Sequence, residues 1–223
     1  MYRSKIDLHN VDCLEFMKKC EDNQFDLAIV DPPYGIGYDI ACAKNNGKKF
    51  GGNTKAKRNT YHSSGWDNQI PDAVYFSELK RVSKNQIIWG WNYFVAYLND
   101  CPSYIVWNKK TNGNFADCES AWCSKRGPAR VFEYLWNGML QQNMKDKEIR
   151  IHPTQKPVQL YRWLLSNYAE KGNKILDTHL GSASIAIACD DMGFDLEATE
   201  IDIEYFTAAK KRLGQHRNQQ RLF

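Results

Sequence analysis

Residues 31–34, Asp31, Pro32, Pro33 and Tyr34, place an acid and an aromatic ring around two prolines. They follow the apolar run LAIV at 27–30, so they stand at the end of a predicted buried strand. Each proline ring fixes one backbone torsion, which stiffens the turn. The stretch therefore predicts a rigid turn that presents a carboxylate and an aromatic ring at a strand end.

A second candidate site lies late in the chain, within residues 174–202. A predicted strand ends in Asp177, small residues around Gly181 lead into a helix, and the next strand ends in Glu200. Glycine lets a ligand approach the backbone closely, and an acid at the next strand end can accept hydrogen bonds from ribose hydroxyls. The segment lacks both GxGxxG and Gly-Lys-Ser/Thr, which disfavours a dinucleotide and a phosphate ligand. It favours a nucleoside without phosphates; a tight turn that binds nothing is the alternative.

The stretch from Ala41 to Trp66 contains no acid and forms a third candidate site. Its glycines and asparagines predict a flexible loop, which we place at 39–66. The loop's cations favour binding to a polyanion, whereas a solvated surface loop is the plainer interpretation. These cations are Lys44, Lys48, Lys49, Lys55, Lys57 and Arg58.

Short apolar runs and helical patterns alternate along the chain and have to position these sites. The predicted strands are 6–9, 25–30, 86–90, 104–107, 131–136, 174–177 and 196–200. The predicted helices are 13–20, 72–83, a segment that begins at Pro157, 184–192 and 203–213. Alternation of this kind predicts an α/β fold with a doubly wound, mostly parallel sheet, whose ligands bind at the carboxyl ends of the strands. We expect one domain over 1–223, with a small insertion at 109–150. The glycine turn follows the proline turn, so the order is permuted relative to an ordinary nucleotide-binding domain.

Composition excludes several classes of protein. The chain has 223 residues and a formal net charge of +4, so overall charge says little about partners. No uncharged apolar run is long enough to span a membrane, and the N-terminus lacks the apolar core of a secretory signal. The seven cysteines are scattered and lie away from the histidines, which predicts reduced thiols in a cytoplasmic protein and no metal site.

Taken together, these segments resemble the DNA amino-methyltransferases of the permuted class, whose catalytic motif precedes the cofactor motif. DPPY at 31–34 matches the catalytic motif, and DTHLGSAS at 177–184 looks like the cofactor loop. HPTQKPVQLYRWLL at 152–165 and VDCLEFM at 11–17 resemble the segments beside the cofactor's methionine and adenine. The stretch 75–94 fits the elements that flank the target pocket. The chain departs from the common cofactor loop at three positions, where Thr178, His179 and Ala183 stand.

The resemblance implies a Rossmann-like domain that transfers a methyl group from S-adenosylmethionine to the exocyclic N6 of adenine in DNA, leaving S-adenosylhomocysteine. The target base would be flipped out of the duplex, and no metal is needed. Asp31 and the carbonyl of Pro32 would accept hydrogen bonds from the amino group, Pro33 would hold the turn, and Tyr34 would stack on the base. The residues implied for the cofactor are Asp12, Cys13, Asp31, Thr154, Lys156, Asp177, Leu180, Gly181, Ser182 and Glu200. The basic loop and Trp66 would contact DNA.

Alternatives remain at this stage. The target could be cytosine N4 or RNA, or the chain could be a catalytically silent nucleic-acid-binding subunit. Asp12 and Cys13 could simply cap a helix, and Lys156 could be solvated instead of pairing with the cofactor carboxylate. The chain is short for this family, which leaves little room for a separate recognition domain. A homodimer and a companion restriction enzyme, in a restriction-modification, phage or mobile-element context, are therefore left open as partners.

Overall fold

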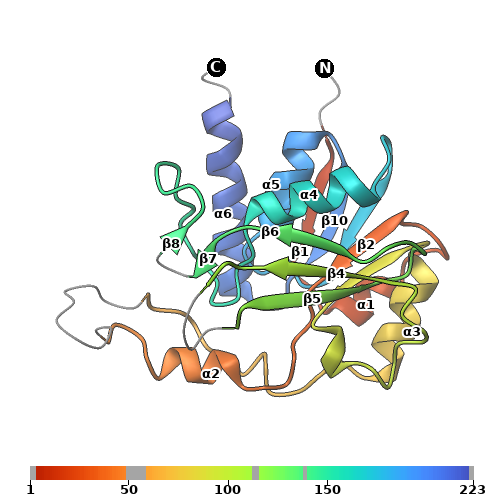
Figure 1. The fold of residues 1–223 in the computed structure, drawn as a ribbon, viewed down its shortest axis with the longest axis horizontal. Helices are drawn as coiled ribbons and strands as arrows, with labels where there is room; N and C mark the ends of the chain where they lie inside the picture. The colour runs from red at the N-terminus through yellow and green to blue at the C-terminus, as the bar shows by residue number, and fades with distance from the viewer. Residues whose placement is uncertain (1–3, 49–58, 112–115, 138–139, 221–223) are drawn as a thin grey trace.

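The computed structural model describes residues 4–48, 59–111, 116–137 and 140–220. At its centre is an eight-stranded sheet in the order β1-β10-β9-β2-β3-β5-β4-β6 (Figure 1). Its strands are β1 (Ile6–His9), β2 (Leu27–Val30), β3 (Gln86–Trp89), β4 (Ser103–Asn108), β5 (Cys118–Cys123), β6 (Arg130–Glu133), β9 (Lys174–Asp177) and β10 (Asp195–Thr199). The first five strands of this order pair in parallel, β5 is antiparallel to β3 and β4, and β6 is parallel to β4. The sheet is therefore mostly parallel.

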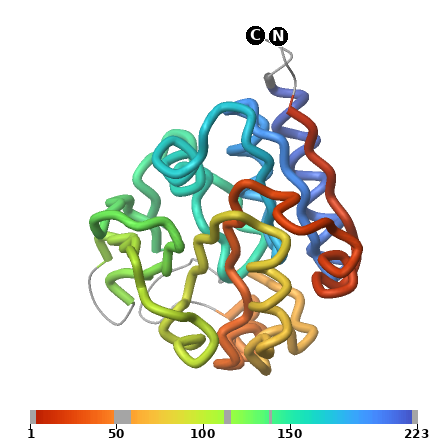
Figure 2. Tube along the Cα trace, turned by 90° about the vertical axis from the view of Figure 1, so that its right-hand side faces the viewer, coloured from red at the N-terminus to blue at the C-terminus, as the bar shows by residue number. Residues whose placement is uncertain are grey.

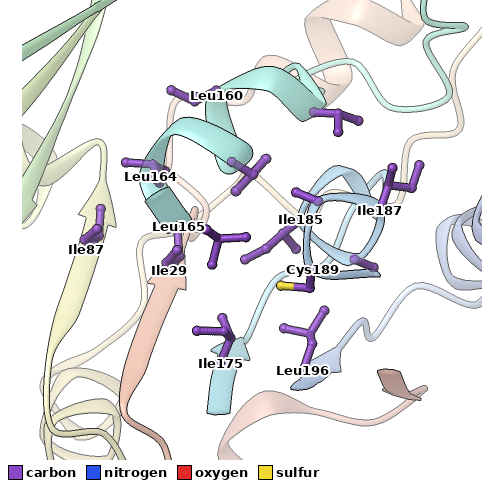
Figure 3. Close-up of a cluster of buried hydrophobic side chains, with 14 of the residues drawn as sticks. Ile29, Ile87, Leu160, Leu164, Leu165, Ile175, Ile185, Ile187, Cys189 and Leu196 are labelled. Carbon is purple, nitrogen blue, oxygen red and sulfur yellow. The ribbon is translucent and has the colours of Figure 1, made fainter. Parts of the chain in front are cut away.

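Helices cover both faces of the sheet because successive strand residues point to opposite sides. In β2, Leu27 and Ile29 join a buried cluster with α4 (Val158–Tyr168), α5 (Ser184–Met192) and α6 (Ile203–Gln220). Ala28 and Val30 point the other way, into a cluster with α1 (Cys13–Met17) and α3 (Ala73–Val82). Figure 3 shows strand isoleucines meeting the leucines of α4 and the apolar side chains of α5. The predicted doubly wound α/β class is confirmed.

The middle of the chain differs from the prediction. The segment 109–150 is not a separate insertion throughout, because it supplies β5 and β6 to the central sheet. The expected strand 131–136 is divided: β6 ends at Glu133, and β7 (Trp136–Asn137) pairs with β8 (Leu140–Gln141) in a two-stranded sheet. β5 was not predicted, because CESAWC has no β-branched residue and no regular alternation of apolar and polar residues.

Smaller differences concern the helices. The loop expected at 39–66 begins within α2 (Tyr38–Ala43), a helix that was not predicted. Pro157 occupies the N-cap of α4 rather than its first helical position. Gly193 directly follows α5 in the left-handed conformation common at helix ends, with φ of 75°. The short 3-10 helix η1 (Trp91–Tyr93) directly follows β3.

The first and the last strand of the chain are neighbours in the sheet, where β1 lies beside β10 (Figure 2). Parallel pairing from β1 to β3 brings the carboxyl ends of five strands to one edge, and ligands in such sheets bind at that edge. Among the helices of the described residues, none is both long and apolar enough to cross a membrane.

Candidate active site

The predicted cofactor residues gather around a cavity of about 190 Å³ at the carboxyl edge of the sheet. Nine of the ten line it: Asp12, Cys13, Asp31, Thr154, Lys156, Leu180, Gly181, Ser182 and Glu200. Asp177 is buried beneath them and is not part of the lining. Residues that were not among the predicted site residues also line this cavity. Gln155 and Tyr161 come from the predicted segment 152–165, and Tyr205 comes from outside the motifs.

The late glycine turn holds Glu200 firmly. Its carboxylate accepts hydrogen bonds from the backbone N–H of Gly181 at 2.9 Å and of Asp202 at 3.0 Å. Burial raises the pKa of Glu200, and these two N–H groups oppose the rise. Gly181 has φ of 50°, a conformation that other residues adopt at a cost. The turn thus presents an oriented acid, as recognition of a ribose requires.

The departures from the common cofactor loop have structural explanations. Ala183 adopts φ of 61°, so the backbone is left-handed at the position where the common cofactor loop has its second glycine. The hydroxyl of Thr178 lies 2.7 Å from that of Tyr75 and 2.9 Å from Nδ1 of His179. Burial lowers the pKa of His179 to about 4, so this imidazole is neutral at pH 7. Thr178 and His179 therefore form a buried, uncharged polar network with α3.

Asp177 is set apart from the other acids by its protonation. It accepts one hydrogen bond, from the backbone N–H of His179 at 3.0 Å. Burial raises the pKa of Asp177 to about 8, partly opposed by that N–H, and the carboxylates of Asp31 and Glu200 raise it further. Asp177 is therefore mostly protonated at pH 7.

Asp12 caps a helix, as one interpretation predicted, whereas Cys13 is the first residue of that helix and not its cap. Asp12 caps α1 by accepting hydrogen bonds from the N–H groups of Leu14 and Glu15, and it also lines the cavity. Burial, followed by the charge of Asp12, raises the pKa of Cys13 to about 12, which keeps it a thiol. Ligand contact by either residue remains a prediction.

A larger cavity, of about 750 Å³, lies beside the first and contains the whole proline turn, Asp31 to Tyr34. The two cavities share five lining residues: Asp31, Pro33, Trp66, Thr154 and Gln155. The larger cavity also has two tryptophans, Trp107 and Trp136, and the charged pair Lys109 and Glu119. Asp31 therefore stands where the two spaces meet.

Lys156 is the cation of this junction. Its side chain is only 3% exposed, so the interpretation of a solvated lysine is wrong. Its ammonium contacts Asp31 Oδ2 at 2.5 Å and Glu119 Oε2 at 3.0 Å, and Glu119 also pairs with Lys109. Although burial raises the pKa of Glu119, the two lysines outweigh it and hold that pKa at about 2. Pairing of Lys156 with a cofactor carboxylate remains a prediction.

Tyr34 is fixed on several sides. Its hydroxyl donates to Asp31 Oδ1 at 2.6 Å, and its ring stacks on Tyr93 with centroids 5.0 Å apart. The ring also lies against Gly90, where an added Cβ would come within 2.1 Å of Tyr34 Cε1. One face of Tyr34 is therefore covered by a neighbour, and its stacking on a base remains a prediction.

The predicted DNA-binding residues are only partly described. Lys44 caps the end of α2, and Lys48 lies in the turn that follows. Lys49, Lys55, Lys57 and Arg58 lie outside the described residues. Trp66 lines both cavities, with its ring 5.1 Å from that of His152.

Lys109, Glu119 and Gly90 also belong to this site and were not predicted from the sequence. Glu119 lies on β5, a strand that was not predicted, and Lys109 directly follows β4. No motif therefore connected these two residues with Lys156. Gly90, at the end of a predicted strand, carried the signal that a neighbour approaches the backbone closely. Among the described residues, no group of three or more acidic, histidine or cysteine side chains is placed to hold a metal ion.

Comparison with known proteins agrees with this geometry. The model of the N6_N4_Mtase family, described as DNA methylase, matches residues 25–211. The Type II methyltransferase M.HinfI of Haemophilus influenzae is 25% identical over 91% of this chain, and the chain spans 66% of that relative's length. Two solved structures share the fold. M1.HpyAVI in complex with SAM has a TM-score of 0.54 and 20% identity over 93% of this chain and 100% of that one. The cytosine-N4-specific PvuII DNA methyltransferase has a TM-score of 0.60 and 13% identity over 97% and 93%.

The family match covers most of the chain, so the chain belongs to the N6_N4_Mtase family of DNA methylases. The resemblance drawn from the motifs is confirmed, and so is the prediction of an enzyme of the DNA methyltransferase class.

Proposed function

We propose that this protein transfers the methyl group of S-adenosylmethionine to the exocyclic N6 of adenine in DNA. The observation that carries the proposal is the position of Asp31 in the lining of both cavities. A carboxylate at that junction can reach an amino group in the larger cavity and a methyl group presented from the smaller one. Two reactants held in this way need no further assembly before transfer.

The smaller cavity suits an adenosyl ligand without phosphates. Glu200 is oriented to accept hydrogen bonds from ribose hydroxyls, and Asp12 is a further acceptor in the lining. Among the lining residues the one lysine or arginine is Lys156, which already faces two carboxylates, so no cation is free for a phosphate. When bound, S-adenosylmethionine supplies an electrophilic methyl group on a sulfonium.

The residues of the proline turn would activate the amino group. The lone pair of an aromatic amine is delocalised into the ring, so the nitrogen is a weak nucleophile. Asp31 and the carbonyl of Pro32 accept hydrogen bonds from its N–H groups and take up the positive charge that develops on nitrogen. The ammonium of Lys156 and the hydroxyl of Tyr34 hold Asp31 in place.

The larger cavity has the size and lining that a flipped base requires. Its volume of about 750 Å³ exceeds that of one base, and Trp107 and Trp136 offer apolar surface. Adenine is favoured because Asp31 occupies the first position of the motif. The basic loop would hold DNA phosphates. A homodimer and a companion restriction enzyme stay predictions.

Sequencing with modified-base detection on DNA from cells that express the protein tests this function. N6-methyladenine at one sequence context, absent from cells that express Asp31→Ala, is the expected result. N4-methylcytosine would instead move the target to cytosine. Unmodified DNA, together with S-adenosylmethionine binding in a titration of the purified protein, would leave a silent subunit and overturn the proposed reaction.

A further inference from the structure

Asp67 lies at the far end of the acid-free stretch from the proline turn, yet it is bonded to that turn. Its side chain is buried, with 2% of its surface exposed. Oδ1 accepts hydrogen bonds from the backbone N–H of Tyr34 at 2.8 Å and of Gly35 at 3.0 Å, and Oδ2 accepts from Tyr38 at 2.8 Å. The carbonyl of Asp67 accepts from the N–H of Gly37 at 2.9 Å. Four backbone N–H groups of residues 34–38 thus converge on this one residue.

The turn is shaped for this contact. Gly35 and Gly37 both have positive φ, 70° and 64°, which curves the backbone around the carboxylate. Within the described part of the chain, no cation lies within ion-pair distance of Asp67. The buried charge is therefore satisfied by N–H groups of the turn, and hydrogen bonds to a charged acceptor are the stronger kind.

The contact extends to the catalytic carboxylate. The N–H of Tyr34 is held by Asp67, while the hydroxyl of the same residue donates to Asp31 at 2.6 Å. Tyr34 is therefore anchored at both ends, with its ring fixed between them against Gly90 and Tyr93. Displacement of the backbone at 34–35 would move the hydroxyl and, with it, the oxygen of Asp31.

We infer that Asp67 is a positioning residue for methyl transfer: through Tyr34 it sets the orientation of the Asp31 carboxylate. This inference rests on the proposed function. Asp67 lines the larger cavity but is absent from the lining of the smaller one, so it acts on the step of transfer and not on cofactor binding. An amide at this position would lack one acceptor and would present N–H donors to the N–H groups of the turn.

The test compares Asp67→Asn with Asp26→Asn. Asp26 also accepts a backbone hydrogen bond, from Lys174 at 2.9 Å, but it precedes β2 at the end of that strand opposite the proline turn. Three quantities are measured for each protein: amide hydrogen exchange of the peptide covering 31–38, affinity for S-adenosylmethionine by titration, and the single-turnover rate of methylation of unmethylated DNA. Both substrates are saturating in the rate measurement.

For Asp67→Asn we expect at least tenfold faster exchange at 34–38, a single-turnover rate at least tenfold lower, and a Kd for S-adenosylmethionine within threefold of wild type. Asp26→Asn should keep the exchange and the rate within threefold. If Asp67→Asn does not fold, Asp67→Ser, which keeps a small acceptor, is measured in its place.

A wild-type rate in the Asp67 variant, or an equal loss of rate in the Asp26 variant, would overturn the inference. So would unchanged exchange at 34–38. Absence of methylation by the wild-type protein would instead contradict the proposed function. In that case the exchange measurement alone decides whether Asp67 orders the turn.

Discussion

Replacing Lys156 with methionine should destabilise the protein by about 3–5 kcal/mol at pH 7. The side chain is buried and its ammonium lies 2.5 Å from Asp31 and 3.0 Å from Glu119. Removing the cation takes away the lysine that pairs with Asp31 and leaves Glu119 paired with Lys109 only, in a poorly solvated site. Loss of one partner of a buried pair costs this much. The pKa of Glu119 leads to a similar magnitude. It lies at about 2 against 4.5 for a free glutamate, which corresponds to about 3 kcal/mol of stability at neutral pH. Lys109 supplies part of that effect, and Glu119 is 27% exposed. Lys156 therefore contributes at most about 3 kcal/mol through the pKa of Glu119.

The effect has a defined pH dependence. A depressed carboxyl pKa stabilises the folded state above about pH 4.5, and this stabilisation is lost as the pH falls toward 2. Without Lys156 the carboxylates bind protons at higher pH, so the difference between variant and wild type is largest at pH 7 and shrinks toward pH 4.5. Urea unfolding followed by tryptophan fluorescence at pH 7, 5.5 and 4.5 measures it.

The matched control is Lys84→Met. Lys84 pairs with Asp26 at 2.6 Å, but it is 54% exposed, so its loss should cost at most about 1 kcal/mol. Equal costs for the two substitutions, or a cost of Lys156→Met that stays constant with pH, would refute the buried ion-pair network of Lys156, Asp31 and Glu119.

Three further substitutions test the site. Gly90→Ala should lower the methylation rate at least tenfold with little change in cofactor affinity. The added Cβ would come within 2.1 Å of Tyr34, and the φ of 68° at this position disfavours alanine. An unaltered rate would contradict the packing of Tyr34 against Gly90. Ala183→Gly should raise the free energy of unfolding by about 1 kcal/mol in urea, since φ at this position is 61°; a destabilised variant would exclude strain there. Asp177→Asn should gain stability relative to wild type as the pH rises from 5 to 8, by up to about 1.4 kcal/mol per pH unit. The pKa of Asp177 of about 8 means that the folded wild type holds a proton which the unfolded chain releases near pH 4. A stability difference independent of pH would contradict a protonated Asp177 in the folded protein.

The sequence predicted what short-range patterns can encode. Apolar runs such as LAIV and KILD mark strands buried on both faces, and their parallel order brought Asp31, Asp177 and Glu200 to one edge. Motif identity then indicated which ligand that edge would receive. Both inferences depend on residues close together in sequence, and both were confirmed at the level of fold and family.

What could not be predicted depends on contacts between distant segments. Strand β5 pairs with β3 and β4, but its own residues include one strand former, Trp122, and no β-branched residue, so Glu119 could not be assigned to the site. The partners of Lys156 were missed for the same reason: one lies at the end of β2 and the other on β5. Ion pairs across a sheet leave no periodic signal in the sequence.

The basic loop is also held by contacts between distant segments, in this case hydrogen bonds. Asn46 exchanges two hydrogen bonds with the backbone of Tyr61, and the carboxylate of Asp39 accepts from Ser63 and from the N–H of Gly65. These bonds join the outgoing and returning parts of the loop on either side of the basic residues. The returning part also contains Trp66, which lines both cavities, so the described ends of the loop lie next to the candidate active site. The bonds that hold them there join residues distant in sequence, which no local pattern predicts.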